Sequence, residues 1–303
     1  MAIRIQSIPL SLEEDESTLQ RKAAEYLKIS AEHIQNSKII KKSLDARRKN
    51  RLHFVYALEL TLSAEQEKKV FDQPPLNLQI QKVTEAPAQV SARIRKKPAQ
   101  RPVIVGTGPA GLFAALKLTE SGLPPLILER GKQIPGRVKD VERFWHNGIL
   151  EAESNVQFGE GGAGTFSDGK LYTRLHDPRV SAILETFHRF GAPSEILYLQ
   201  RPHIRTDNLR RVVLAIRQHL QGQGAEFKFQ AKVTGLKIFH HEVRGVMVNE
   251  KDEIEASILL LALGNSARDT FRMLQSSGVA LEPKPFAVGL RVEHPQRLID
   301  RIQ

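Results

Sequence analysis

The stretch VIVGTGPAGLFAALKL, from Val103 to Leu118, decides the fold. It opens with a short apolar run, continues through three glycines in six positions, and ends in an apolar pattern at helical spacing. The segment PPLILERG follows as a second apolar run, which ends at Glu129. A buried strand, a glycine turn, a helix and a second strand in this order predict a β-α-β unit of a parallel, doubly wound sheet.

Each glycine of this unit has a physical reason to be there. Gly106 permits the tight turn from strand to helix, Gly108 lets a pyrophosphate approach the backbone, and Gly111 lets helix and strand pack closely. The unpaired N–H groups and the positive end of the helix dipole then face the phosphates. Glu129 can accept a hydrogen bond from a ribose hydroxyl. The unit therefore predicts dinucleotide binding; the alternative is a glycine-rich turn that binds nothing.

A long glycine-rich loop, NVQFGEGGAGTFSDGKLYTR from Asn155 to Arg174, stands before any third strand is apparent. It has too many glycines for a helix and too few alternating apolar residues for a strand. We expect its backbone to wrap closely around a bulky cofactor. Lys170 and the hydroxyls of Thr165 and Ser167 then lie within reach of phosphate or flavin oxygens.

The N-terminal part has a different pattern of apolar and polar residues. AIRIQSIPL and RLHFVYALELTL alternate like strands, and SLEEDESTLQRKAAEYLKI between them has helical spacing. This pattern predicts a small β-α-β unit and hence an α+β domain over residues 1–85. The proline-containing, aperiodic residues 86–101 are the expected linker, and residues 102–303 form the second domain.

Composition and charge bound the function. The chain of 303 residues has no cysteine, which excludes disulfides, thiolate metal sites and cysteine nucleophiles. No signal peptide and no apolar run of membrane-spanning length is visible, so we expect a cytoplasmic protein without membrane association. Part of the net charge of +11 lies in residues 38–51. Nucleic-acid binding there is the alternative to a solvated basic face or a surface for the rest of the molecule.

Two later segments fit a dinucleotide-binding plan. HIRTDNLRRVVLAIRQHL predicts a helix over residues 208–220 with Asp207 at its cap, followed by strands around Phe227 and Val233. ASILLLALGNSARDT predicts a further buried strand ending in a glycine turn.

These segments together resemble a family of bacterial FAD-dependent dehydrogenases that lack an assigned substrate. The resemblance is carried by VGTGPAGLFAALKL, LERG, NVQFGEGGAGTFSDGKL, KKSLDARRKN and ALGNSARDTFRML, and covers residues from about 12 to 303. It implies a Rossmann-like FAD/NAD(P)-binding domain of the glutathione-reductase type, a small N-terminal domain, and the beginning of an inserted substrate domain. The cofactor it implies is non-covalent FAD, with NAD(P)H as a candidate donor and a small molecule as substrate.

The resemblance completes the set of cofactor-binding residues that we predict. They are Gly106, Gly108, Pro109, Ala110, Gly111, Glu129, Arg130, Arg137, Ala163, Gly164, Thr165, Lys170, Val233, Ala262 and Gly264. The chain departs from the family at two positions, because members usually have a glycine where Arg205 stands and a histidine where Asn265 stands. The family's chains also continue further, so the resemblance leads us to expect a C-terminally truncated substrate domain.

The resemblance implies an oxidoreductase that transfers hydride through flavin N5. Two alternatives stay open: a nucleic-acid-associated flavoprotein with a basic N-terminal domain, and an FAD-binding remnant without catalysis. His203 and His176 are candidates for proton transfer, with a structural or surface histidine as the alternative for each. The pair His240 and His241, expected at a hairpin edge, lacks a carboxylate at metal-ligand spacing, so we expect no metal site.

Overall fold

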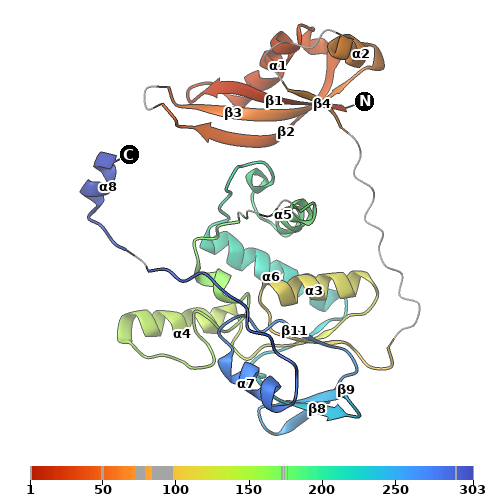
Figure 1. Cartoon of the computed structure of the whole chain (residues 1–303), viewed down its shortest axis with the longest axis vertical. Helices are drawn as coiled ribbons and strands as arrows, with labels where there is room; N and C mark the ends of the chain where they lie inside the picture. The colour runs from red at the N-terminus through yellow and green to blue at the C-terminus, as the bar shows by residue number, and fades with distance from the viewer. Residues whose placement is uncertain are drawn as a thin grey trace.

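The computed structural model describes residues 2–48, 51–72, 79–83, 98–171, 173, 175, 177–290 and 292–302 (Figure 1). The elements of its N-terminal part are β1 (Ala2–Ser11), η1 (Glu16–Thr18), α1 (Leu19–Leu27), η2 (Ala31–His33), β2 (Ile34–Asp45), β3 (His53–Leu62), α2 (Ala64–Asp72) and β4 (Ile80–Lys82). The second part contains β5 (Val103–Val105), α3 (Pro109–Glu120), β6 (Leu126–Leu128), α4 (Ile134–Asn147), η3 (Ala163–Phe166), α5 (Arg179–Arg189), η4 (Ser194–Leu197), α6 (Thr206–Gly222), β7 (Glu226–Lys228), β8 (Val233–Phe239), β9 (Glu242–Val248), β10 (Asp252–Glu255), β11 (Leu259–Leu261), α7 (Arg268–Ser276) and α8 (Gln296–Ile302).

The N-terminal part is a four-stranded sheet in the order β2-β3-β1-β4, covered by helices. Apolar residues of β1 and β3 alternate into a core against α1, which buries Leu19, Ala23 and Leu27. The α+β class predicted for this part is confirmed. The predicted β-α-β unit is wrong in detail, because β1 pairs antiparallel with β3 and a further strand, β2, lies between α1 and β3 in the chain.

The missed strand β2 contains much of the basic stretch at residues 38–51. It lies at the edge of the sheet and meets the second part of the chain there. The N–H of Lys42 donates to the carbonyl of Tyr198 at 2.8 Å, and the N–H of Gln200 donates to the carbonyl of Lys42 at 2.9 Å. The stretch therefore includes a surface for the rest of the molecule. Most of the linker predicted at residues 86–101 lies outside the described residues, so that boundary stays a prediction.

The second part is built on a parallel sheet in the order β11-β5-β6-β7. The first strand of this part, β5, is central, and the chain adds β6 and β7 on one side before it crosses to β11 on the other. This is the strand order of a dinucleotide-binding Rossmann-like sheet. The predicted fold class, α/β with a Rossmann-like domain, is confirmed.

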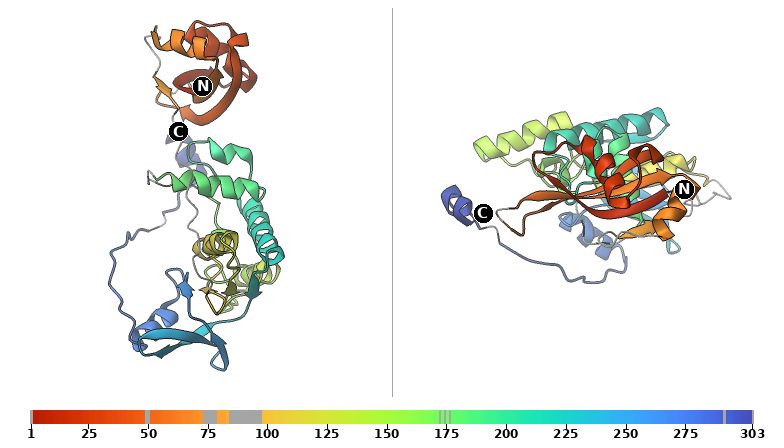
Figure 2. Two further views of the ribbon diagram at one scale, coloured as in Figure 1. Left: turned by 90° about the vertical axis from the view of Figure 1, so that its right-hand side faces the viewer. Right: turned by 90° about the horizontal axis from the view of Figure 1, so that it is seen from above.

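Both faces of this sheet are covered, as the wholly apolar strands β5, β6 and β11 require. Ile104 and Ile127 point to one face, where α3 and α6 cover them. Val103 and Leu128 point to the other, where the antiparallel sheet β8-β9-β10 packs. Figure 2 shows that sheet at one end of the molecule and the N-terminal sheet at the other. None of the described helices combines the length and the apolar composition needed to cross a bilayer.

The chain between β6 and β7 departs from a simple crossover. It contains α4, the glycine-rich loop, α5 and finally α6, which returns to the sheet beside α3. The helix predicted over 208–220 is present but begins earlier, with Arg205 as N-cap and Asp207 inside the first turn, so the predicted cap is wrong. Arg205 has φ 64° and ψ 149°, a conformation that glycine adopts far more readily. This is the position where the family resemblance leads us to expect glycine.

Candidate functional site

A cavity of about 680 Å³ lies at the carboxyl ends of the parallel strands. Ligands bind at this edge in open α/β sheets, and volumes in this range are usual for cofactor sites. Eleven of the predicted cofactor-binding residues line it. They are Gly106, Gly108, Pro109, Ala110, Glu129, Arg130, Ala163, Gly164, Val233, Ala262 and Gly264.

The three glycines of the first turn differ in how much room they leave for a side chain. A Cβ at Gly106 (φ 106°) would lie 2.4 Å from the carbonyl oxygen of Ala262, and one at Gly111 would lie 2.0 Å from that of Gly106. Neither position tolerates a side chain. Gly108, the N-cap of α3, has φ −66° and ψ 179°, and a Cβ there would meet only the Cα of Gly162, at 4.0 Å. The space in front of Gly108 thus belongs to the cavity.

Glu129 is buried beside this turn and accepts four hydrogen bonds. Its Oε2 accepts from the N–H of Thr107 at 2.9 Å and from the Thr107 hydroxyl at 2.6 Å. Its Oε1 accepts from the N–H of Gly131 at 2.9 Å and from that of Gly159 at 3.0 Å. The carboxylate therefore ties the glycine turn to the glycine-rich loop as well as lining the cavity.

Arg137 does not line the cavity, so its predicted contact with a cofactor is not supported. Its side chain is fully buried, and its guanidinium donates to backbone carbonyls of the glycine-rich loop, among them those of Asn155 at 2.8 Å, Glu160 at 2.7 Å and Gly162 at 2.8 Å. Burial lowers the pKa of Arg137 to about 10, which leaves it charged at neutral pH. Arg137 fixes the shape of the loop that reaches the cavity.

Two neighbours in the loop also have internal roles. Thr165 is buried away from the cavity and its hydroxyl donates to the carbonyl of Glu160 at 3.1 Å, so its predicted cofactor contact is not supported. The carboxylate of Glu160 is fully buried. It accepts from the N–H of Ile134, at the start of α4, at 2.8 Å, and from Arg217 of α6 at 2.6 Å.

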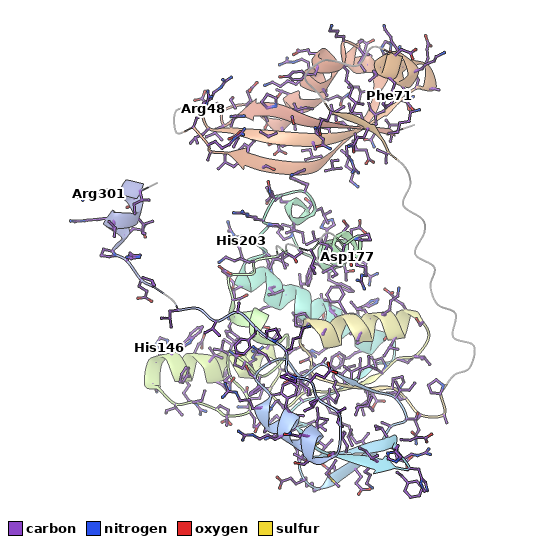
Figure 3. All side chains as sticks on the ribbon, viewed as in Figure 1. Arg48, Phe71, His146, Asp177, His203 and Arg301 are labelled. Atoms are coloured by element: carbon purple, nitrogen blue, oxygen red, sulfur yellow. The ribbon has the colours of Figure 1, made fainter. Side chains whose placement is uncertain are left out.

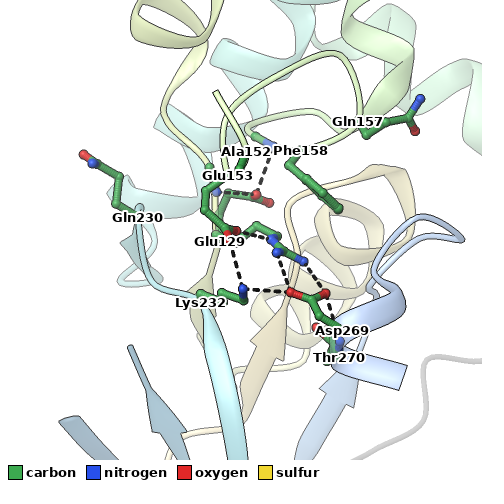
Figure 4. A network of polar contacts seen from close by, with 12 residues as sticks. Glu129, Ala152, Glu153, Gln157, Phe158, Gln230, Lys232, Asp269 and Thr270 are labelled. Carbon is green, nitrogen blue, oxygen red and sulfur yellow. Dashed lines mark hydrogen bonds and ion pairs between the residues drawn. The ribbon is translucent and has the colours of Figure 1, made fainter. Parts of the chain in front are cut away.

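Arg130, the residue after Glu129, joins a network of four ionic side chains at one end of the cavity (Figure 4). Its Nε donates to Glu153 at 2.6 Å, and its two terminal nitrogens donate to the carboxylate of Asp269 at 3.0 and 2.7 Å. Lys232 lies 2.9 Å from Glu153 and 2.8 Å from Asp269. The ring of Phe158 lies 4.0 Å from the guanidinium carbon of Arg130.

The pKa values in this network are shifted toward the ionised forms. Donation by Arg130 holds the pKa of Asp269 well below its usual range. Burial works against ionisation of Arg130 and Glu153, but their mutual hydrogen bond and those to Asp269 and Lys232 outweigh it, so the pKa of Arg130 is raised and that of Glu153 lowered. Hydrogen bonds to Asp269 and Glu153 also raise the pKa of Lys232. All four groups are charged at neutral pH.

Of the other predicted contacts, Val233, Ala262 and Gly264 line the cavity and Lys170 does not. Val233 begins β8, and Ala262 and Gly264 follow β11; Asn265, next to Gly264, also lines the cavity. Lys170 does not line it. Its backbone pairs with that of His203, on the exposed loop before α6 (Figure 3), and its ammonium lies 2.9 Å from Asp168. The cofactor contact predicted for Lys170 is therefore not supported.

The candidate proton-transfer residues lie apart from the cavity or outside the described residues. His203 is exposed and is not in the cavity lining. His176 lies outside the described residues. His240 and His241 form the two-residue turn between β8 and β9, both with positive φ, which confirms the expected hairpin. Among the described residues no group of histidine and acidic side chains is arranged to hold a metal ion.

Several lining residues were missed from sequence. Phe158 precedes the predicted contacts in the glycine-rich loop, while Lys232 stands directly before β8 and Phe271 after β11. For Lys232 the only sequence signal is its place next to Val233, whereas Phe158 and Phe271 lie several residues from any predicted position and have no such signal. The pairing of Arg130 with Asp269, 139 residues along the chain, has no sequence signal.

A second hollow, of about 960 Å³, lies on the N-terminal part beside the basic stretch. Its cations are partly neutralised within the chain: Arg47 pairs with Asp45 at 2.5 Å, and Lys22 pairs with Glu14 at 2.6 Å. Because of these ion pairs the surface carries both positive and negative charges. The alternative that this part binds nucleic acid is therefore not supported.

Two family models match parts of the chain. Residues 2–61 match a domain of unknown function, DUF8436, and residues 104–169 match the NAD(P)-binding Rossmann-like domain. The second match spans the glycine turn, Glu129 and most of the glycine-rich loop, and agrees with the strand order of the sheet.

Comparisons with whole proteins give one close relative and several distant folds. An uncharacterized protein from Clostridium beijerinckii is 41% identical over 302 residues, which cover 99% of this chain and 56% of that protein. The chain thus spans little more than half the length of this relative. Among solved structures, Thermovibrio ammonificans THI4 is 16% identical with a TM-score of 0.38, covering 59% of this chain and 63% of that one. The L-amino acid deaminase from Proteus vulgaris is 14% identical with a TM-score of 0.37, covering 60% and 51%.

Proposed function

We propose that the chain binds FAD non-covalently in the 680 Å³ cavity and acts as a flavin-dependent oxidoreductase on a small-molecule substrate. One observation carries the proposal: the glycine turn, the end of β6, the start of β8 and the turn after β11 all line this cavity, together with Gly162–Gly164 of the glycine-rich loop. The match to an NAD(P)-binding Rossmann-like domain over residues 104–169 supports an adenine dinucleotide as the ligand.

The first turn of α3 fits a pyrophosphate. The first amides of a helix have no intrahelical acceptor, and Gly108 offers no side chain to cap them. The helix dipole adds a favourable field for negative charge. The N–H groups of Ala110 and Gly111 would hold the phosphates, and Pro109 at the first helical position removes a donor that the helix cannot use.

The end of the cavity at Glu129 and Val233 fits adenosine. Four donors fix the Glu129 carboxylate, and one of them, the Thr107 hydroxyl, is able to turn away and leave an Oε2 lone pair for a ribose hydroxyl. Val233 begins a strand and lines the cavity, so its backbone would be the group that contacts the adenine. Arg130 would cover the same end, where its guanidinium carbon lies 4.0 Å from the centre of the Phe158 ring.

The opposite end, at Ala163 and Gly164, would receive the flavin. Small residues there and at Ala262 and Gly264 let backbone approach a planar ring closely. When bound, FAD would supply hydride transfer between the substrate and flavin N5, with NAD(P)H as the candidate donor. Asn265, where the family usually has histidine, contributes an amide that donates and accepts hydrogen bonds without exchanging a proton near neutral pH.

The proposal is tested by purifying the full chain and recording its visible absorption spectrum before and after heat release of ligand. We expect a flavin spectrum, and the mass of FAD in the released fraction. Addition of NADH or NADPH under anaerobic conditions is expected to bleach the bound flavin. A colourless chain that stays colourless after incubation with FAD would refute the proposal.

A further inference from the structure

The ionic network at the adenosine end is electrically balanced. Arg130 and Lys232 contribute two positive charges, and Glu153 and Asp269 contribute two negative charges within hydrogen-bond distance of both cations. Three of the five guanidinium N–H groups of Arg130 and two of the three of the Lys232 ammonium point at these carboxylates. The two cations are therefore largely committed to partners within the chain.

With the adenosine placed at Glu129 as proposed, the two cations of the network lie near the 2′ position of its ribose, whereas Glu153 and Asp269 hold these cations without lining the cavity themselves. Arg130 directly follows Glu129, the residue placed for the ribose, and Lys232 directly precedes Val233; both cations line the cavity. In dinucleotide-binding sheets a free arginine near this position accommodates the 2′-phosphate that distinguishes NADP from NAD. Arg130 stands in the right place for that role, but its bidentate pair with Asp269 occupies the two terminal nitrogens that would grip a phosphate.

The acids also act directly against a phosphate. A 2′-phosphate close enough to bond Arg130 or Lys232 would lie beside the carboxylates of Glu153 and Asp269, which both stay ionised because their pKa values are lowered. The negative charges of the phosphate and of these carboxylates would repel each other strongly, because they would be neighbours in a partly buried site. Moving the acids away would break the contacts that join α7 and the loop at Glu153 to the end of β6.

We propose that Glu153 and Asp269 make the cavity selective for adenine dinucleotides with a free ribose 2′-hydroxyl and exclude 2′-phosphorylated ones. This inference rests on the proposed function, since it assigns the adenosine to the end of the cavity at Glu129. It extends that function in a defined way. A 2′-phosphorylated nicotinamide donor does not take the cofactor's place in this cavity, and so does not compete with FAD there.

The test compares two ligands that differ only by the 2′-phosphate: ADP-ribose and ADP-ribose 2′-phosphate. Their affinities for the full chain, freed of flavin, are measured by calorimetry at one fixed ionic strength, because salt screens such interactions. We expect the unphosphorylated ligand to bind at least about tenfold more tightly. In the double variant Glu153→Gln/Asp269→Asn the preference is expected to disappear or reverse, because Arg130 and Lys232 are then free to bind phosphate.

A matched control separates the local effect from the change in net charge. Glu226→Gln/Glu255→Gln removes two acids that pair with Arg101 and Gln100, away from the cavity lining, and is expected to keep the wild-type preference. Retained affinity for ADP-ribose shows that the Glu153→Gln/Asp269→Asn variant still folds. The single variant Asp269→Asn is expected to show a preference for ADP-ribose that is weaker than that of the wild type and stronger than that of the double variant.

Each outcome of the comparison is decisive. Equal affinity of the wild-type chain for both ligands overturns the selectivity. An unchanged preference in both the double and the single variant overturns the assignment to these two acids. If the wild-type chain binds none of the three ligands, ADP-ribose, ADP-ribose 2′-phosphate and FAD, the proposed function is overturned and the selectivity with it. This result differs from the first two, in which the chain still binds at least one of these ligands.

Discussion

Replacing Gly108 by valine tests the pyrophosphate site without disturbing the fold. Gly108 has φ −66° and ψ 179°, which any residue before a proline adopts readily. An added Cβ would meet only the Cα of Gly162, at 4.0 Å, so the branching carbon of the valine fits at this position. Its methyl groups would occupy the space between the cofactor phosphates and the first amides of α3. We expect a folded chain that no longer holds FAD tightly.

The size of the loss follows from the contacts removed. Hydrogen bonds to charged groups contribute about 1.5–3 kcal/mol each, so losing two of them weakens binding by about 3 kcal/mol or more, which is at least about a hundredfold in Kd. Gly111→Ala is the matched contrast. Its Cβ would lie 2.0 Å from the carbonyl oxygen of Gly106, an overlap with backbone that costs about 3 kcal/mol or more of folding free energy.

Two measurements distinguish these effects. Flavin fluorescence on titration of the flavin-free chain gives the Kd for FAD, and urea unfolding gives stability. We expect Gly108→Val to change the Kd by at least about a hundredfold with a midpoint near wild type, whereas Gly111→Ala lowers the midpoint. A Gly108→Val chain that binds FAD within threefold of wild type would refute the assignment of the phosphates to α3.

Three further predictions concern stability. Arg205→Gly, compared with Arg205→Ala in urea unfolding, is expected to be more stable by about 1–2 kcal/mol, because both variants lose the side chain and only glycine relieves the strain at φ 64°. Asp269→Asn is expected to lower the free energy of unfolding by about 1 kcal/mol at pH 7. Because the pKa of Asp269 is lower in the folded than in the unfolded chain, the difference between variant and wild type is present above about pH 4 and shrinks as the pH falls below about 4. Unfolding curves at pH 7 and pH 3 will check this. Glu160→Gln is expected to cost about 3–5 kcal/mol, because it leaves the buried charge of Arg217 without its partner, whereas Glu120→Gln at an exposed pair is expected to cost less than about 0.5 kcal/mol.

The β-α-β unit was predictable because its signals are local and agree with one another. Wholly apolar strands, glycines at fixed offsets, Pro109 at the first helical position and Gly122 just past the end each specify the same local structure. The strand β2 was not predictable in this way. As an edge strand it exposes lysines on its outer face, so its periodicity of two is diluted by charge, and its pairing with β3 has no local signal.

Two of the predicted site residues that lie outside the cavity, Arg137 and Thr165, do so for one physical reason. Sequence pattern identifies a loop that must approach a cofactor, but it does not say which way each side chain of the loop points. A chain with many glycines cannot hold its own shape, because glycine loses the most conformational freedom on ordering. Something must therefore fix the loop from behind, and buried polar groups that bond backbone carbonyls do so. Arg137 and Thr165 are these groups. Their residue types fit phosphate binding equally well, and only the direction of their hydrogen bonds separates a residue that holds a cofactor from one that holds the loop.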